Sequence, residues 1–297
     1  MSRAHSISSR RAYGLQRVCR VWDRARSSVY ARRRATRSPV RLRRPGPVGA
    51  APDEVLVGHL RRVLEASPFH GEGYRKAWAK LRFEGIRTSK ERVRRLMREH
   101  GLQAPHRAGH PHGPKAHDGT ITTEAPDVMW GTDMTSTVTV GEGSAFVFVA
   151  VDHCTTECIG LHAAKSGSRF EALETIRQGV RERFGGVGEG VARGLSLRHD
   201  HGSNYLADDF QQEIKFFGIE SSPSFVREPE GNGVAERFIR TLKENLLWVR
   251  SFETIEELRL ALLEFKRTYN EQWMLEKFSY RSPAQARRDL LGLDVAA

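Results

Sequence analysis

The chain has 297 residues, with 48 Lys or Arg against 36 Asp or Glu, and its formal net charge of +12 gives a pI near 10.0. Hydrophobic residues make up 39% of it, which suits a globular protein with at least one sizeable core rather than a disordered chain. No apolar run approaches the roughly 18 residues of a membrane span, the Arg-rich start lacks a secretory apolar segment, and the cysteines are too few for a disulfide framework. We therefore expect a cytoplasmic protein without a membrane partner.

The charge is unevenly distributed along the chain. Residues 1–50 contain 14 Arg and one acidic residue, residues 51–118 carry a net +6, and residues 119–297 carry a net −7. A basic surface gains affinity for nucleic acid because its phosphate contacts release counterions. The N-terminal half is therefore expected to bind nucleic acid, with a disordered basic tail as the alternative interpretation of the start.

Residues 1–36 predict a basic helix-turn-helix. Helical spacing of Leu15, Val18, Val21 and Trp22, followed by a restart near Ser27, predicts two short helices with a break between them. The second helix could enter a major groove, and the candidate DNA contacts around its start are Arg24, Arg26, Ser27, Ser28 and Tyr30. Residues 37–52 contain four prolines and two glycines and are a predicted linker.

Residues 53–102 predict a second helical DNA-binding domain, with helices at about 53–66, 72–84 and 89–100. Thr88 with Glu91 three residues later has the spacing of a capping box for the last helix, and Gly101 is expected to end it. On this helix Arg92 and Arg95 remain for solvent or phosphate. Residues 103–122 are a second predicted linker, whose histidines match no standard zinc spacing: His106, His110, His112 and His117.

From residue 128 the spacing of the apolar residues changes from the helical period to every second residue. Trp130, Met134, Val138 and Val140 alternate with polar residues, which predicts a half-buried strand with Asp133 on its polar face. A glycine-containing turn at 141–143 and an apolar run at 145–151 predict an antiparallel hairpin. Further strands are expected at 159–163 and 195–199, on either side of a helix at 168–184. This order indicates a mixed α/β sheet.

Two further acidic residues, Asp200 and Glu236, are candidates for the same site as Asp133. Asp200 directly follows the predicted strand 195–199, although it could simply cap the next helix. Glu236 lies on a helix expected to run to about Val249, where Arg240 and Lys243 share its face. A surface ion pair with Arg240 is the structural alternative for Glu236.

The three acids together could hold divalent metal, because Mg²⁺ prefers carboxylate oxygens together with water and phosphate. Two such ions, roughly 4 Å apart, would assist phosphodiester displacement. The apolar residues expected on the opposite side of the Glu236 helix are Val234, Phe238, Leu242 and Leu246.

The segments WGTDMT, HDHGSNY and GNGVAERFIRTLKENL resemble the three acid-bearing motifs of DDE transposases with a retroviral-integrase-type core. Thirty-five residues separate Asp200 from Glu236, which is the spacing characteristic of that group, and Lys243 matches its basic residue seven positions after the glutamate. The ending YNEQWMLEKFSYRSPAQA and the helical stretch YRKAWAKLRFEGIRTSKERVRRLMREHGL resemble the insertion-sequence-three family of bacterial transposases, specifically its catalytic second-frame product. The resemblance covers about residues 70–290.

This resemblance implies an RNase H-like integrase core at residues 123–250, a mixed five-stranded sheet with flanking helices, preceded by small all-α helix-turn-helix domains. Residues 251–297 would form a C-terminal helical extension. Asp133, Asp200 and Glu236 are implied as catalytic ligands of Mg²⁺ or Mn²⁺, with two ions bound. Lys243 and Arg240 are implied as contacts to terminal DNA.

The implied reaction is metal-dependent cleavage at the end of an insertion sequence, followed by attack of the exposed 3′-hydroxyl on another phosphodiester, without a covalent enzyme–DNA intermediate. The implied partners are terminal inverted repeats, target DNA, further copies of the chain in a synaptic multimer, and an upstream-frame helix-turn-helix protein. The site of action would be the bacterial nucleoid. His201 and the proline-bearing stretch SPSFVREPEGNG differ from the residues more common in this family. These differences could alter the preference for particular end sequences. A catalytically inactive DNA-binding regulator and an RNase H-like nuclease remain as alternatives.

Overall fold

The computed structural model describes residues 4–37, 51–105, 123–224 and 232–293. The chain divides into two compact units, residues 1–52 and 53–297, and each is described by itself. Most of the first predicted linker, the four histidines near residue 110 and the proline-bearing stretch at 225–231 lie outside the described residues. Within the described part, no helix combines the length and apolar character that crossing a bilayer requires.

The first unit contains the two predicted short helices, α1 (Leu15–Val21) and α2 (Arg26–Arg37). The predicted apolar stripe of α1 is wrong in part, because Val21 and Trp22 are 76% and 60% exposed. Cys19 is the one buried residue among the described residues 4–34. Two short helices bury little surface when no third element packs against them. The spacing of the apolar residues therefore predicted the two helices but not which side chains are buried.

Three helices open the second unit: α3 (Asp53–Glu65), α4 (Tyr74–Phe83) and α5 (Lys90–Glu99). Their shared core is formed by apolar residues from all three, including Leu56, Leu60, Leu81, Val93, Leu96 and Met97. The predicted cap of α5 is corrected by one position: Ser89, not Thr88, is the N-cap, and its side chain accepts a hydrogen bond from the Arg92 amide. Gly101 follows α5 with a φ of +65°, as its predicted role at the helix end requires.

This helical bundle contacts the C-terminal part of the same unit. The amide of His70 donates to Asn245 Oδ1 at 2.7 Å, and the Phe69 and Trp273 rings meet edge to face with centroids 4.9 Å apart. Arg75 forms an ion pair of 2.8 Å with Glu276. These contacts link two of the predicted domains, the helices of residues 53–102 and the C-terminal extension, within the second unit.

The centre of the unit is a five-stranded mixed sheet with strand order β3-β2-β1-β4-β5. Strands β1 (Met129–Thr139), β2 (Gly143–Asp152) and β3 (Cys158–Ala164) are antiparallel neighbours, so the predicted hairpin and third strand are confirmed. Strands β4 (Ser196–His199) and β5 (Glu220–Pro223) run parallel to β1. The predicted mixed five-stranded architecture is therefore present.

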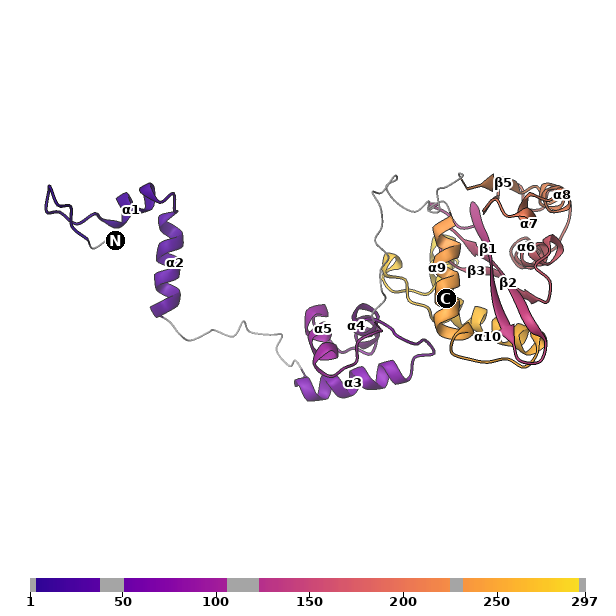
Figure 1. Ribbon diagram of the computed structural model, residues 1–297, viewed down its shortest axis with the longest axis horizontal. Coiled ribbons are helices and arrows are strands. Elements are labelled where there is room, and N and C mark those ends of the chain that lie inside the picture. The colour runs from indigo at the N-terminus through magenta and orange to yellow at the C-terminus, as the bar shows by residue number, and fades with distance from the viewer. Residues whose placement is uncertain (1–3, 38–50, 106–122, 225–231, 294–297) are drawn as a thin grey trace. The chain divides into compact units, whose positions relative to one another are not determined.

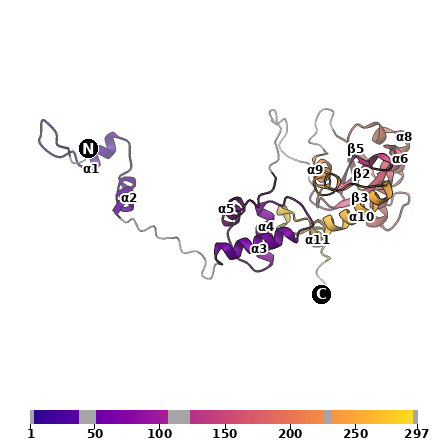
Figure 2. The same ribbon diagram turned by 60° about the horizontal axis from the view of Figure 1, so that its bottom comes forward.

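Helices cover both faces of the sheet, with α6 and α9 on opposite sides (Figure 1). On one face, α6 (Arg169–Phe184) and α8 (Asp208–Phe216) pack on a core that includes Trp130, Phe148 and Ile159. On the other, α9 (Gly233–Leu242) and α10 (Ile255–Gln272) pack on Val147 and Val149. Helix α10 runs beside β3 (Figure 2). The remaining helical segments are α7 (Ser203–Leu206), the π-helical turn η2 (Lys243–Leu247), the 3-10 turn η3 (Glu276–Phe278) and α11 (Pro283–Leu290).

Strand β1 does not follow the simple inside-outside alternation that its sequence predicts. Val138 and Val140 are 69% and 68% exposed, whereas Thr132 and Thr139 are buried. Helix α6 packs on β2 and β3, so the far end of β1 is left uncovered on that side, while the first half of the strand is covered on both faces. A central strand between two helical layers has no fully polar face.

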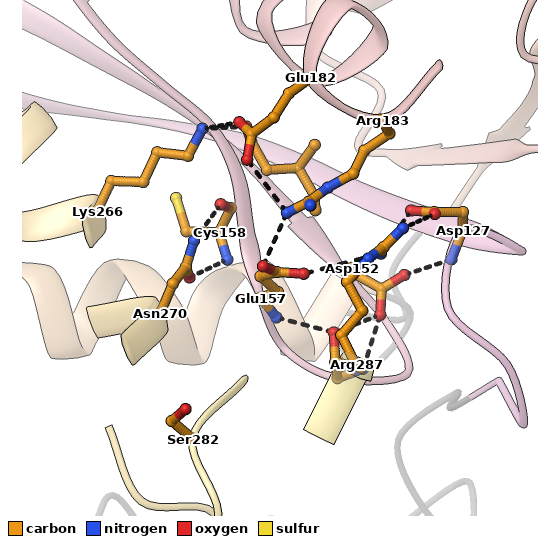
Figure 3. A network of polar contacts seen from close by, with 12 residues as sticks. Asp127, Asp152, Glu157, Cys158, Glu182, Arg183, Lys266, Asn270, Ser282 and Arg287 are labelled. Carbon is orange, nitrogen blue, oxygen red and sulfur yellow. Dashed lines mark hydrogen bonds and ion pairs between the residues drawn. The ribbon is translucent and has the colours of Figure 1, made fainter. Parts of the chain in front are cut away.

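A buried polar network ties α11 to one end of the sheet (Figure 3). Arg287 of α11 pairs with Asp127, which precedes β1, and lies 3.7 Å from Glu157. Glu157 pairs with Arg183 of α6 at 2.8 Å, and the Asp127 amide donates to Asp152 at 2.9 Å. Burial raises the pKa of both Asp152 and Glu157. The arginines are therefore needed to compensate carboxylates that water hardly reaches.

Candidate active site

Two of the three predicted acids lie level on neighbouring parallel strands. In the β1–β4 ladder Gly131 pairs with Arg198, an offset of 67 residues. The same offset relates Asp133, two residues further along β1, to Asp200, the first residue after β4. Adjacent strands are about 4.8 Å apart, so the backbone itself brings these two carboxylates to the same edge of the site.

Asp133 is half-buried on the face of β1 that α9 covers, because its partner on β2 is Val149. The Met134 amide donates to its Oδ1 at 2.7 Å. The pKa of Asp133 is raised to about 6, mainly by burial and in part by the negative charges of Asp200 and Glu236, while the Met134 amide and the Lys243 charge oppose the change. The charges of Asp200, Glu236 and Lys243 thus all act on Asp133.

Asp200 is held at the end of β4 by main-chain bonds. Its Oδ1 accepts from the Gly202 amide at 2.8 Å, and its carbonyl accepts from His199 Nδ1 at 2.7 Å. Its carboxylate is exposed, as a group that meets a ligand must be. His201, which differs from the residue more common in the family, forms a hydrogen bond through Nε2 with the Ser224 carbonyl at 2.6 Å. This bond is made to the main chain and not to the Asp200 carboxylate.

Glu236 lies in the first turn of α9, whose apolar side is buried against the sheet as predicted through Val234, Phe238 and Leu242. Reduced hydration raises the pKa of Glu236, and the nearby positive charge of Arg240 opposes the rise. The helix predicted to run to about Val249 continues past Leu242, where α9 ends, as the π-helical turn Lys243–Leu247. Single π-turns inside helices occur often at functional sites, and this one begins with Lys243.

The predicted DNA contacts of the helical regions have different surroundings. Those at the start of α2 are all exposed: Arg24, Arg26, Ser27, Ser28 and Tyr30. On α5, by contrast, Arg92 Nε donates to Asp53 Oδ1 at 2.7 Å and Arg95 Nη2 donates to Asp53 Oδ2 at 2.7 Å. These two arginines have an intramolecular acidic partner, which DNA phosphates would have to replace.

The arrangement has the chemistry of a divalent-cation site, although its ligands are not in contact. Within the described ranges, no three His, Cys, Asp or Glu side chains lie close enough together to hold an ion. The negative charges of Asp200 and Glu236 nevertheless help to raise the pKa of Asp133. Carboxylate oxygens are hard donors of the kind that a cation of the Mg²⁺ type prefers.

Comparison with known proteins agrees with this arrangement. Residues 57–109 match the HTH-like domain, and residues 123–229 and 217–283 match the integrase core domain. The transposase InsD for insertion element IS2A/D/F/H/I/K of Escherichia coli is 26% identical over 242 residues, covering 80% of this chain and 79% of that protein. An uncharacterized 48.2 kDa protein of Escherichia coli insertion element IS2A is 26% identical over 291 residues, covering 96% of this chain and 67% of that protein.

Among solved structures, the HTLV-2 integrase catalytic core domain in complex with magnesium is 18% identical with a TM-score of 0.42, covering 55% of this chain and 98% of that one. The BIV integrase catalytic core is 19% identical with a TM-score of 0.41, covering 57% and 99%. The chain thus contains segments that match the integrase core domain, preceded by a segment that matches the HTH-like domain. The predicted resemblance to bacterial insertion-sequence transposases with a retroviral-integrase-type core is confirmed, and the insertion-sequence-three family is consistent with the matches.

The raised pKa of Asp133 predicts that its replacement stabilises the fold. The shift from 3.8 to about 6 corresponds to about 3 kcal/mol at most, and it makes the wild type less stable as pH rises from about 4 through 6. Asp133→Asn removes this titration and keeps an oxygen that accepts from Met134. The variant should therefore have the higher Tm at pH 8, with a difference that vanishes near pH 4, in thermal unfolding without divalent metal. Equal Tm values at pH 8, or an equal gain from the exposed Asp208→Asn, would contradict this.

Proposed function

We propose that this chain cleaves the DNA ends of an insertion sequence and transfers the exposed strands to target DNA, as a DDE transposase. The observation that supports the proposal is the level placement of Asp133 and Asp200 on the neighbouring strands β1 and β4, together with the action of the Glu236 and Lys243 charges on the pKa of Asp133. Three acids from two strands and a helix, in an integrase core, are suited to phosphodiester chemistry. The HTH-like domain at residues 57–109 supplies a means of reaching DNA.

We propose that Asp133, Asp200 and Glu236 hold divalent cations, Mg²⁺ or Mn²⁺, with two ions in the working site. When bound, such cations supply charge stabilisation to the attacking and leaving oxygens of a phosphodiester displacement. The residues of the chain perform the remaining tasks. The Met134 amide fixes one Asp133 oxygen, and the Gly202 amide fixes one Asp200 oxygen. Lys243 and Arg240, whose charges act on Asp133 and Glu236, are proposed to contact the phosphates of terminal DNA.

The helical regions are proposed as the DNA-binding parts, with α2 contacting DNA through the exposed residues at its start. Arg92 and Arg95 are proposed as phosphate contacts only where DNA displaces Asp53, so they are weaker candidates than the residues of α2. Because two element ends must be joined to one target, the working form is proposed as a homo-multimer. We also propose that an upstream-frame helix-turn-helix protein is a partner of the chain and that the chain resides on the bacterial nucleoid.

The test is a joining assay with the full chain and labelled DNA from the ends of its own element. With Mg²⁺ or Mn²⁺ we expect cleaved ends and strand-transfer products, and with chelator alone we expect bound but uncut DNA. Binding without cleavage under every condition would favour the inactive regulator. Cleavage without joining, to the same extent on unrelated DNA, would favour the nuclease.

A further inference from the structure

We propose that the loop between α3 and α4, residues 66–73, docks the HTH-like domain onto the helix that carries Glu236, with Phe69 and Asn245 as positioning residues. This inference rests on the proposed function, because it concerns how bound end DNA is held relative to the three acids. Two sets of contacts lead from this loop to α9. One reaches the turn at the end of the helix, and the other reaches the helix close to Glu236.

Asn245 joins the loop to the π-turn η2. Its Oδ1 accepts from the His70 amide at 2.7 Å, and its Nδ2 donates to the Thr241 carbonyl of α9 at 2.8 Å. The residue is only 9% exposed, so losing either bond would leave a polar group with little access to water. Lys243 is the first residue of the same turn. One asparagine side chain therefore connects the loop to the turn that carries the proposed phosphate contact.

A row of aromatic rings makes the second connection. Phe69 meets Trp273 edge to face with ring centroids 4.9 Å apart, and Trp273 stacks on Tyr269 at 5.7 Å. Tyr269 in turn meets Phe238 edge to face at 4.8 Å. Phe238 is buried on α9, two positions after Glu236. Aromatic pairs have preferred geometries, so displacing Phe69 should alter the packing of a row that ends next to the glutamate.

Phe69 is buried in the core of the catalytic part and not in the core of its own domain. It is 5% exposed and belongs to the cluster that α9 and α10 form on one face of the sheet. Among the described residues, the shared core of α3, α4 and α5 is a separate cluster that does not include Phe69. Removing the Phe69 ring should therefore undock the helical domain without unfolding it.

The loop is shaped by bonds within its own domain. Glu72 is 5% exposed, pairs with Lys80 of α4 and accepts from the Ser67 hydroxyl at 2.8 Å. Ser67 Oγ in turn accepts from the Phe69 amide at 3.2 Å. These bonds hold the main chain at Phe69 through partners in the HTH-like domain alone. The loop and the helices are therefore expected to keep their form when the loop leaves α9.

Docking of this kind fixes how end DNA bound by the helical domain meets the three acids. In catalysis a displacement of about 1 Å, even from a change far from the reacting atoms, can cost roughly 100-fold in rate. A helical domain released from α9 would still bind DNA, but it would no longer present the end in one fixed position. Neither Phe69 nor Asn245 needs to touch DNA or a cation for this effect.

The test uses the full chain with Phe69→Ala, Asn245→Leu and the two changes together. Phe217→Ala is the control for a lost buried ring, since Phe217 is 3% exposed in the core on which α6 and α8 pack. Thr175→Val is the control for a lost bond within a helix, since the buried Thr175 hydroxyl donates to the Ala172 carbonyl at 2.7 Å. Hydrogen exchange of peptides covering residues 66–73 and 243–250 is measured without DNA. Strand transfer and end-DNA binding are measured with labelled ends of the element.

We expect exchange at residues 66–73 to become about 3- to 10-fold faster in Asn245→Leu, because one buried hydrogen bond is lost, and Phe69→Ala to act in the same direction. Strand transfer should fall by about 10-fold or more in each single variant, with end-DNA binding largely kept. The double variant should lose little more than the worse single variant, because both changes break the same docking contact, whereas independent defects would add.

Unchanged exchange of the loop in both single variants, effects equal to those of the two controls, or additive losses in the double variant would each overturn the docking. Equal losses of strand transfer and end-DNA binding would place the defect in DNA binding and overturn it as well. If the wild type neither cuts nor joins DNA, the proposed function fails. Faster exchange of the loop in Phe69→Ala and Asn245→Leu, but not in the controls, would still support the docked loop in that case.

Discussion

Asp133→Asn, Asp200→Asn and Glu236→Gln should each reduce strand transfer by about 10³-fold or more while leaving the binding of end DNA largely intact. Each change keeps the size of the side chain and removes one negative charge from the shared site that raises the pKa of Asp133. Losing several kcal/mol of charge stabilisation in the transition state costs a factor of ten for each 1.4 kcal/mol or so. Gel-based joining assays and fluorescence anisotropy on the same preparations measure the two properties.

The matched control for these substitutions is Asp208→Asn, which removes an exposed carboxylate at the start of α8. It should join DNA at the wild-type rate. Retained joining in any of the three acid variants would remove that residue from the metal-ligand set. Parallel loss of joining and end-DNA binding would instead indicate damage to the DNA-binding surface.

Arg287→Met should lower the free energy of unfolding by about 3 kcal/mol or more, measured by urea denaturation at pH 8. Removing this cation leaves Asp127 without its buried counter-charge and Glu157 with Arg183 alone, and breaking a buried ion pair on one side typically costs about 3–5 kcal/mol. Because burial raises the pKa of Glu157, the loss should shrink at acidic pH, where this carboxyl takes up a proton in the folded protein.

Arg250→Met provides the control for this prediction, since Arg250 and Glu257 form a surface pair at 3.0 Å. An exposed pair contributes about 1 kcal/mol or less. Adding Asp127→Asn to Arg287→Met should recover part of the lost stability, because it removes one of the uncompensated charges. If Arg287→Met costs no more than Arg250→Met, the network in Figure 3 does not anchor α11.

The strands could be predicted because their signals are local. The change of period near residue 128 marks β1, and the turn at 141–143 defines the hairpin whose register the structure then shows. The motif spacing predicts Asp133, Asp200 and Glu236 as one site. The sheet topology places two of them, Asp133 and Asp200, on neighbouring parallel strands.

What the sequence left undetermined depends on contacts between distant residues. Val138 has the pattern of a buried strand residue, but α6 covers β2 and β3 instead of the end of β1. Arg92 and Arg95 have the pattern of free cations, but Asp53 lies across from them, about 40 positions earlier in the chain. Ser89 and Thr88 are equally good caps by type, and backbone geometry decides between them.

Asn232 lies within the motif GNGVAERF, yet its residue type predicts no contact with the sheet, because an asparagine beside glycines favours a turn. In the structure its Nδ2 donates to the Thr132 carbonyl at 2.8 Å, 100 positions away in the chain. Only the fold reveals that these two residues meet.

The level placement of Asp133 and Asp200 makes the length of β1 a constraint on the active site. Successive residues of a strand face opposite sides of the sheet. Deleting one residue between Gly131 and Asp133 would keep every motif readable in the sequence, but it would turn the aspartate towards α6, on the opposite side of the sheet from Glu236. A loop can absorb an inserted residue, whereas a change of one residue in this part of β1 would reverse the side of the sheet that Asp133 faces.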